Sequence, residues 1–369
     1  MRTDTDVFVV GGGPAGLAAA IAAARKGLSV AVADGSEPPI DKPCGEGMMP
    51  ETQVALEALG VDLPAGLGWN FRGIRFVHDD CQIEAPFPWG RGMGIRRPLL
   101  HGLLIQAAEK QGIQLLWKTA VAGIEERGVR LAGRVVSTRW IIGADGGASR
   151  VRKWADLDDT MQRAQRLASR RHYGVKPWSE YMEIHWGKKV QAYVTPISSE
   201  EVCIVMMGDE SEDVKFEHAL MRLPQLRERL SGAQLASRER GAVTVMKRLH
   251  RVVRGNVALV GDASGGVDAI TGEGLRLTFR QAAALADAME TGDLRAYQHV
   301  HRELQKRPMR MGKLMVELGR REAVRGRVMR AMGERPDLFE QMLAIHVGQA
   351  TSREIVATGA QLGWQFLAA

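Results

Sequence analysis

The chain has 369 residues, of which 45% are hydrophobic and 25% charged, a composition typical of soluble globular proteins. This length favours two intertwined domains over one simple core. The formal net charge of +7 is too diffuse to indicate a nucleic-acid partner, and no nucleic-acid motif is present. Cys44, Cys81 and Cys203 fit neither a disulfide framework nor a zinc motif, so we expect a reducing, cytoplasmic location and no metal site.

The chain begins with a pattern typical of a Rossmann-type unit. Residues 6–10 are predicted to form a strand, residues 17–26 an alanine-rich helix and residues 28–33 a second strand. Residues 7–24 carry no charge and resemble a membrane span in hydropathy, but several glycines and a proline divide them into strand, turn and helix. We therefore expect the start of a soluble α/β domain.

The turn between this strand and helix carries the pattern G-x-G-x-x-G, formed by Gly11, Gly13, Pro14, Ala15 and Gly16. Gly11 would allow the tight turn, Gly13 the close approach of a pyrophosphate, and Gly16 the close packing of the helix. Asp34 ends the second strand and could accept hydrogen bonds from an adenosine ribose. The pattern predicts a dinucleotide site and leaves NAD and FAD as alternatives.

Three later stretches carry further signals. Residues 97–108 predict a helix with an apolar face at Leu100 and Leu104. Residues 141–152 predict a strand that ends in Gly-Ala-Asp-Gly, and residues 261–274, "GDASGGVDAITGEG", form a second glycine-rich loop after an apolar strand.

Together these stretches resemble the FAD-dependent oxidoreductases of the para-hydroxybenzoate hydroxylase type, which include geranylgeranyl reductases and flavin halogenases. That family shares the glycine fingerprint, an R-x-x-L-x-x-x-L helix, a GADG-x-x-S-x-V-R segment and a late G-D-A segment, in the order found here. Residues 42–50, with the pattern K-x-C-G-x-G, and residues 271–274, "TGEG", are most similar to the geranylgeranyl reductase branch. Ala269 stands where that branch usually has proline.

The resemblance implies FAD as cofactor, with NAD(P)H as electron donor, and assigns roles by position. Asp34 would bind the adenosine ribose, Arg97 would lie near the pyrophosphate and ribityl chain, and Asp262 would bind a ribityl hydroxyl. Asp145 would support FAD through its surrounding backbone. The remaining expected contacts with the flavin are Cys44, Gly45, Gly261, Gly272, Glu273 and Gly274. No catalytic residue is identified; Cys44 is a candidate for chemistry near the flavin, with packing as its alternative role.

A physical argument supports the position of the late loop. Reduction of the flavin places negative charge on the N1–C2=O edge of its ring. A helix that begins near Gly274 would direct its positive end and free N–H groups toward that edge. The glycines of the loop would permit the flavin ring to approach the backbone closely.

The predicted fold class is α/β, or α+β overall, with a Rossmann-type FAD-binding domain, a β-sheet substrate domain and C-terminal helices. The FAD-binding domain is predicted to be discontinuous, over residues 1–70, 96–163 and 245–296. The substrate domain is predicted over residues 71–95 and 164–244 and the helical region over residues 297–369. Six large side chains could line an apolar substrate pocket: Trp89, Trp178, Met182, Trp186, Met206 and Met207.

The C-terminal region is strongly basic. Residues 301–330 contain ten Lys or Arg and three Glu, beside a predicted apolar stripe formed by Met311, Leu314, Met315 and Leu318. A solvated face is one interpretation; the other is a docking surface for an acidic partner protein or an anionic membrane, which would make a cytoplasmic protein peripheral to the inner membrane. A final helical stretch, residues 337–366, is predicted to pack on the FAD-binding domain.

The leading hypothesis for function is an NAD(P)H-dependent monooxygenase that acts on an apolar aromatic or polyketide-like substrate through a flavin hydroperoxide. A second hypothesis is reduction of isoprenoid C=C bonds, although the P-x-x-Y-x-W-x-F-P segment of that branch is missing and residues 191–196 are at most a remnant of it. A third is hydroxylation of a tryptophan in a partner protein during biogenesis of a quinone cofactor. A non-enzymatic flavin-binding protein is the fourth.

Overall fold

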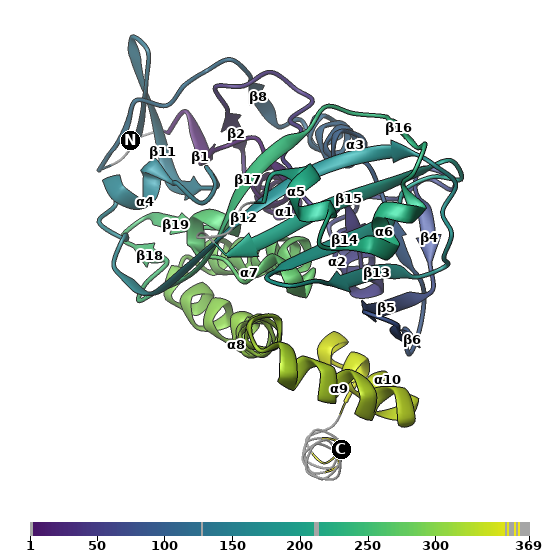
Figure 1. Ribbon diagram of the computed structural model, residues 1–369. Coiled ribbons are helices and arrows are strands. Elements are labelled where there is room, and N and C mark those ends of the chain that lie inside the picture. The colour runs from purple at the N-terminus through teal and green to yellow at the C-terminus, as the bar shows by residue number, and fades with distance from the viewer. Residues whose placement is uncertain are drawn as a thin grey trace.

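The computed structural model describes residues 3–126, 128–209 and 214–350, and the single residues 353, 358 and 361. The chain builds two large β-sheets with helices around them, and the C-terminal helices run in a row along one side (Figure 1). The predicted fold class is confirmed. Within the described residues, no helix is both long enough and apolar enough to cross a membrane.

The first sheet has the strand order β18-β19-β11-β1-β2-β8. Its strands are β1 (Thr5–Val10), β2 (Val30–Ala33), β8 (Gln114–Leu116), β11 (Arg134–Gly143), β18 (Val253–Arg254) and β19 (Val257–Leu259). All neighbours pair in parallel except β18 and β19. Two short strands, β9 (Gly123–Glu125) and β10 (Gly128–Leu131), extend β11 in antiparallel pairs.

The central strands of this sheet are apolar on both faces, as parallel strands covered by helices require. β1 reads TDVFVV and β2 reads VAVA, and nearly every side chain in them is buried. The covering helices include α1 (Pro14–Ala24), α3 (Arg97–Lys110), α4 (Arg150–Trp154) and α7 (Gly274–Thr291). α1 is rich in alanine and packs against both α3 and α7, because small side chains allow the helices to approach closely.

The second sheet has the order β16-β12-β15-β14-β13-β5-β6, with β17 paired to β12. The strands are β5 (Gly73–His78), β6 (Cys81–Pro86), β12 (Thr160–Gly174), β13 (Met182–Trp186), β14 (Val190–Pro196), β15 (Glu201–Asp209), β16 (Gln234–Leu235) and β17 (Arg240–Leu249). The predicted boundaries at 163/164 and 244/245 fall inside β12 and β17, which pair continuously across them.

Side chains alternate across this sheet, as the two-residue period of a strand requires. Val202, Ile204 and Met206 of β15 lie on one face, where they pack against α5 (Phe216–Leu220) and α6 (Pro224–Arg229). Val205 and Met207 lie on the opposite face and line a cavity shared with the first sheet.

A small third sheet supports the loop that carries Cys44. It has the order β3-β7-β4 and consists of β3 (Gly47–Met48), β4 (Trp69–Phe71) and β7 (Gly92–Gly94). Helix α2 (Pro50–Ala58) follows β3 in the chain. Gly94 is required here, because a Cβ atom would lie 1.9 Å from the carbonyl oxygen of Pro196 on β14. β7 is therefore pressed against the second sheet.

The C-terminal helices are α8 (Leu294–Arg320), α9 (Glu322–Glu334) and α10 (Pro336–Val347). α8 packs on α7, whereas α9 and α10 pack on β6 of the second sheet, where the Phe76 and Phe339 rings are 4.8 Å apart. α10 thus packs mainly on the second sheet, and it also reaches the predicted FAD-binding domain, where His346 lies 2.9 Å from the Thr271 oxygen of the late loop. Most of the predicted stretch beyond residue 350 lies outside the described residues.

Candidate cofactor and active site

A cavity of about 1010 Å³ is lined by residues from both large sheets and the loops between them. Most of the predicted cofactor-binding residues line it: Gly11, Gly13, Pro14, Ala15, Asp34, Cys44, Gly45, Arg97, Asp145, Asp262, Gly272 and Gly274. Gly16, Gly261 and Glu273 do not line it. Segments separated by more than 200 residues thus meet at one site.

The glycines of the N-terminal turn serve two different needs. Gly11 has φ +110°, and a Cβ atom there would lie 2.5 Å from the carbonyl oxygen of Ala144. A Cβ atom on Gly16 would lie 1.8 Å from the oxygen of Gly11, so the protein's own packing requires both glycines. A Cβ atom on Gly13 would meet no atom within 4 Å. Gly13 therefore keeps space open at the N-terminus of α1, where free N–H groups suit an anionic ligand.

Asp34 and His101 hold this turn in place. The Gly12 N–H donates to Asp34 Oδ2 at 2.7 Å, and the Ser36 N–H donates to Asp34 Oδ1 at 2.7 Å. His101 is fully buried on α3; its Nε2 lies 2.8 Å from the Gly12 oxygen and its Nδ1 accepts from the Ile40 N–H at 3.2 Å. Burial lowers the pKa of His101, so the ring is neutral and acts in the structure of the turn.

Arg97 and Cys44 are in direct contact. The Arg97 Nη2 and Nε groups donate to Cys44 Sγ at 2.6 and 3.2 Å, and the Glu46 N–H donates to the same sulfur at 3.3 Å. Arg97 is the first residue of α3 and is buried. The motif helix therefore brings its arginine to the cavity, while Leu100 and Leu104 face the core as predicted.

Asp145 directs its carboxylate toward the start of α4. It accepts from Ser149 Oγ at 2.5 Å, the Arg150 N–H at 2.6 Å and the Val151 N–H at 3.1 Å. Its own segment, which includes Gly146 and Gly147, lines the cavity. The residue thus shapes backbone that a ligand could contact.

The late loop consists of two 3-10 turns, Gly261–Ser264 and Ala269–Thr271, followed by α7. Gly274, Leu275 and Thr278 of α7 line the cavity, and no side chain caps the first N–H groups of this helix. The positive end of α7 therefore lies beside the cavity, as the sequence predicted.

The three acids of this loop have different surroundings. Asp262 is exposed, lines the cavity and pairs with Lys42. Asp268 is buried and pairs with Arg166 at 3.1 Å. Glu273 was predicted to contact the cofactor, but its buried side chain pairs with Arg276 and does not reach the cavity. Its carboxylate supports the helix that begins beside it.

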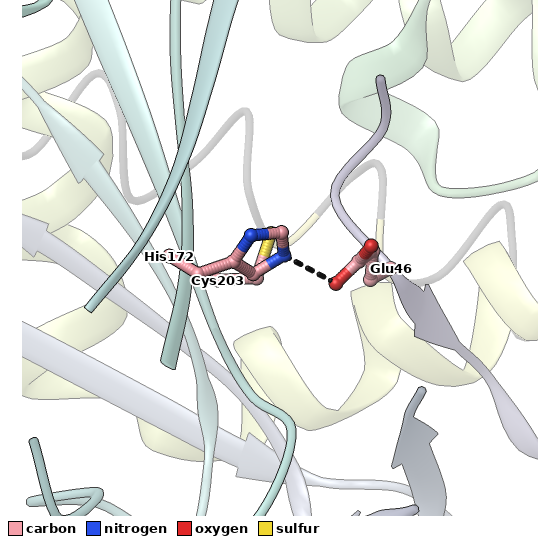
Figure 2. A group of neighbouring side chains, drawn as sticks. All are labelled: Glu46, His172 and Cys203. Carbon is pink, nitrogen blue, oxygen red and sulfur yellow. Dashed lines mark hydrogen bonds and ion pairs between the residues drawn. The ribbon is translucent and has the colours of Figure 1, made fainter. Parts of the chain in front are cut away.

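A buried cluster beside the cavity was not predicted from the sequence. It contains Glu46, His172 and Cys203, whose side chains converge from the 42–47 loop, β12 and β15 (Figure 2). His172 Nδ1 faces Ser237 Oγ at 2.6 Å and an Arg96 N–H group at 3.2 Å. The ring proton is therefore on Nε2, which donates to Glu46 Oε2 at 2.8 Å.

This cluster has the spacing of metal ligands, within 4.8 Å, but its charges are already balanced. The Arg170 guanidinium lies 3.3 Å from Glu46 Oε1, and Arg96 lies beside His172. Burial opposes ionisation of Glu46, but the hydrogen bonds from His172 and Arg97 and the nearby charges together outweigh it, and the pKa of Glu46 lies below its usual value. Burial raises the pKa of the Cys203 thiol well above its usual range, so this sulfur is a poor metal ligand.

The second sheet contributes a group of apolar side chains to the cavity: Ala168, Met182, Tyr193, Val205, Met207, Ala242, Val243 and Val245, with Val267 of the late loop beside them. Polar and charged residues of the same sheet also line the cavity: Gln165, Arg170, Arg240, Thr244 and Lys247. Of the six predicted pocket residues, Met182 and Met207 are therefore present. Met206 points to the opposite face of the sheet, and the three tryptophans do not line the cavity. Within the described residues, no histidine lines it.

The residues of the cavity fit FAD. Gly13, Gly45 and Gly274 each leave open space where a side chain would project, and the N-termini of α1 and α7 supply free N–H groups to the same cavity. The turn at Gly13 and Asp34 would hold the ADP half, and the late loop would hold the ribityl chain and pyrimidine edge. A parallel nucleotide-binding sheet joined to a second sheet across such a cavity defines a flavoprotein oxidoreductase.

The family described as "FAD binding domain" matches residues 4–291. The protein belongs to the FAD-dependent oxidoreductases of the para-hydroxybenzoate hydroxylase type. The resemblance stated from the motifs is thus confirmed, and the chain is an FAD-dependent enzyme.

Two curated relatives cover most of the chain. "Menaquinone reductase" of Mycolicibacterium smegmatis is 26% identical over 325 residues, which are 80% of this chain and 79% of the relative. "Digeranylgeranylglycerophospholipid reductase" of Methanothrix thermoacetophila is 28% identical over 331 residues, which are 81% of this chain and 83% of the relative.

Solved structures share the fold. A flavoprotein/dehydrogenase from Cytophaga hutchinsonii has a TM-score of 0.79 at 19% identity, covering 93% of this chain and 92% of its own. A geranylgeranyl bacteriochlorophyll reductase-like protein from Thermoplasma acidophilum has a TM-score of 0.74 at 20% identity, covering 99% of this chain and 98% of its own.

Proposed function

We propose that the protein reduces C=C bonds in a long, apolar, isoprenoid-type substrate, with NAD(P)H as the source of electrons. The observation that carries this proposal is the group of aliphatic and thioether side chains that the second sheet contributes to the cavity, with Tyr193 as a buried hydroxyl among them. Flexible methionine and branched side chains suit a flexible branched hydrocarbon. The relatives named as reductases of prenylated lipids support the same choice over the monooxygenase first favoured by the sequence.

Tyr193 is the proton donor in this proposal. It lies on β14, and Gln191 Oε1 accepts from both its hydroxyl, at 3.3 Å, and Arg166 Nη2, at 2.7 Å. Burial raises the pKa of Tyr193, so the hydroxyl keeps its proton at neutral pH. FAD, held by the turn at Gly13 and by the late loop, would when reduced supply the hydride for one alkene carbon. Tyr193 gives its proton to the other carbon, and the neighbouring Arg166 stabilises the tyrosinate until solvent returns a proton.

The test uses the full chain reconstituted with FAD and NAD(P)H, and menaquinone as substrate under strictly anaerobic conditions. We expect products heavier by two hydrogens for each saturated bond. Incorporation of labelled oxygen in air, with no anaerobic saturation, would instead support a monooxygenase. Tyr193→Phe is expected to lower the rate about 100-fold or more. Tyr173→Phe, on the opposite face of the same sheet, is the control and keeps its rate.

We also propose that α8 faces an anionic lipid surface. Arg310, Lys313 and Leu314 are exposed and neighbours on one helix face, and Leu314 is 47% exposed. This arrangement would place an apolar side chain beside two cations at the membrane interface.

Part of the predicted basic face has another role: Arg325 is buried and donates to the Gly319 oxygen at 2.9 Å. Leu314, predicted to lie in the apolar stripe, is instead on the surface.

The measurement is cosedimentation with vesicles that contain phosphatidylglycerol. Arg310→Glu combined with Lys313→Glu is expected to weaken binding about tenfold or more. Arg130→Glu combined with Arg134→Glu, at exposed positions of the β10–β11 hairpin, is the matched control. Equal losses in both variants, or binding that neutral vesicles match, would contradict a specific lipid-facing surface on α8.

A further inference from the structure

Glu46 combines two unusual features. Its backbone has φ +59°, in the left-handed region that favours glycine, although it lies between Gly45 and Gly47. Its side chain is nonetheless a carboxylate that is only 2% exposed. A glycine would satisfy this backbone at lower cost, so the carboxylate must contribute something that glycine cannot.

The carboxylate joins three segments of the chain. Glu46 Oε1 accepts from the backbone N–H of Arg97 at 3.0 Å and lies 3.3 Å from Arg170 Nη1, while Oε2 accepts from His172 Nε2 at 2.8 Å. Arg97 begins α3 of the first sheet's layer, and the other two residues belong to β12 of the second sheet. Glu46 therefore fixes the loop against both halves of the protein.

The same residue closes a ring of hydrogen bonds at the cavity. The Glu46 N–H donates to Cys44 Sγ, the Arg97 guanidinium donates to the same sulfur, and the Arg97 N–H returns to the Glu46 carboxylate. Cys44 is also held from β15, because the Cys203 thiol lies 3.7 Å from its carbonyl oxygen. All three members of the ring line the cavity.

We propose that Glu46 is a positioning residue for FAD: it holds Arg97 and Cys44 in the arrangement that the cofactor meets. It acts through these two residues and through Gly45, which leaves open space at the cavity. The proposal applies to FAD binding and does not depend on which reaction the enzyme catalyses.

Two substitutions separate positioning from folding. Glu46→Gly relieves the backbone and removes all three acceptor contacts, yet Arg170 keeps its two bonds to Asp41, both at 2.8 Å, and His172 keeps Ser237. The fold should therefore persist. Glu46→Gln keeps an oxygen acceptor for the Arg97 N–H and removes the charge of the carboxylate. Asp79→Gly is the matched control, because Asp79 also has a positive φ, +50°, but its side chain is 83% exposed.

The readout is the dissociation constant of FAD for apoprotein, measured by flavin fluorescence below the unfolding temperature, with circular dichroism and the thermal midpoint of the apoprotein alongside. We expect Kd to rise about tenfold or more in Glu46→Gly, to stay within about threefold in Glu46→Gln and to be unchanged in Asp79→Gly. A Glu46→Gly protein that is folded and less stable but binds FAD with unchanged Kd would overturn the proposal. Equal losses of affinity in the Gln and Gly variants would also overturn it, because the hydrogen bond that Gln keeps to the Arg97 N–H would then not be what supports FAD binding.

Discussion

The glycines of the N-terminal turn are of two kinds: those that the protein's own packing requires and those that leave room for a ligand. Gly16 is surrounded by the protein itself, with the Gly11 oxygen 1.8 Å from the position of an added Cβ, whereas Gly13 faces open space. In the sequence the two are members of one motif. In the structure, one lets α1 pack on the sheet and the other leaves room beside its N-terminus.

This difference gives a prediction at the residue scale. Gly13→Ala should leave the free energy of unfolding of the apoprotein nearly unchanged and raise the Kd for FAD about tenfold, because the new methyl group enters ligand space. Gly16→Ala should lower the free energy of unfolding by about 1–3 kcal/mol through overpacking. Urea unfolding and fluorescence titration measure both quantities. The same effect of both substitutions on stability would contradict the distinction.

At the scale of elements, the C-terminal helices hold the late glycine-rich loop. His301 of α8 lies 2.9 Å from Ser264 Oγ, and His346 of α10 has its Nε2 2.9 Å from the Thr271 oxygen. His301 is buried and His346 is partly buried, and burial lowers the pKa of each, for His301 to about 3. Helices that follow the FAD-binding residues in sequence thus fix the loop at both of its 3-10 turns.

Acid should therefore weaken this attachment. The folded pKa of His301 is about 3 and the ordinary value is 6.5, so between these pH values the unfolded chain binds more protons. The stabilising contribution is complete above pH 6.5 and is lost progressively toward pH 3. At pH 5 the unfolded chain binds this proton and the folded protein does not, which lowers the free energy of unfolding by about 2 kcal/mol. His301→Gln should flatten the fall in the free energy of unfolding between pH 7 and 5; an unchanged slope would contradict the assignment.

At the scale of the whole molecule, the cavity is the junction between the two large sheets. The nucleotide-binding turn, the late loop and α3 belong to the first sheet's layer, while β12, β14, β15 and β17 form the opposite wall. A ligand that touches both walls stabilises their mutual position, and the free energy of binding adds to the free energy of unfolding.

Bound FAD should accordingly raise the midpoint temperature of thermal unfolding. At FAD concentrations about 100 times Kd, the stabilisation is about 2.7 kcal/mol, which for a chain of 369 residues corresponds to an increase of roughly 3–4 °C. ADP would occupy only the first sheet's side and bind more weakly, so at the same molar concentration as FAD it should give a smaller increase. Scanning calorimetry of the apoprotein with each ligand tests this, and an equal shift with ADP and FAD would argue against a ligand that spans both walls.

The sequence by itself determined the cofactor class and the layer that binds its ADP half. Strand, glycine turn and helix are close in sequence, and the spacing of Gly11, Gly13 and Gly16 dictates their local geometry. The order of the later motifs was enough to establish the family. The C-terminal helices were also predicted from periodicity, but not which element the last of them covers.

Only the tertiary structure decided how the rest of the site is made. Glu46 and His172 are 126 residues apart, and their contact depends on the register of β12 against the 42–47 loop. Tyr193 faces the cavity because side chains alternate along β14, and Met206 and Met207 point to opposite faces for the same reason. A polar side chain in a strand gives no local sign of its partner, because that partner is supplied by a distant strand or loop that folding brings beside it.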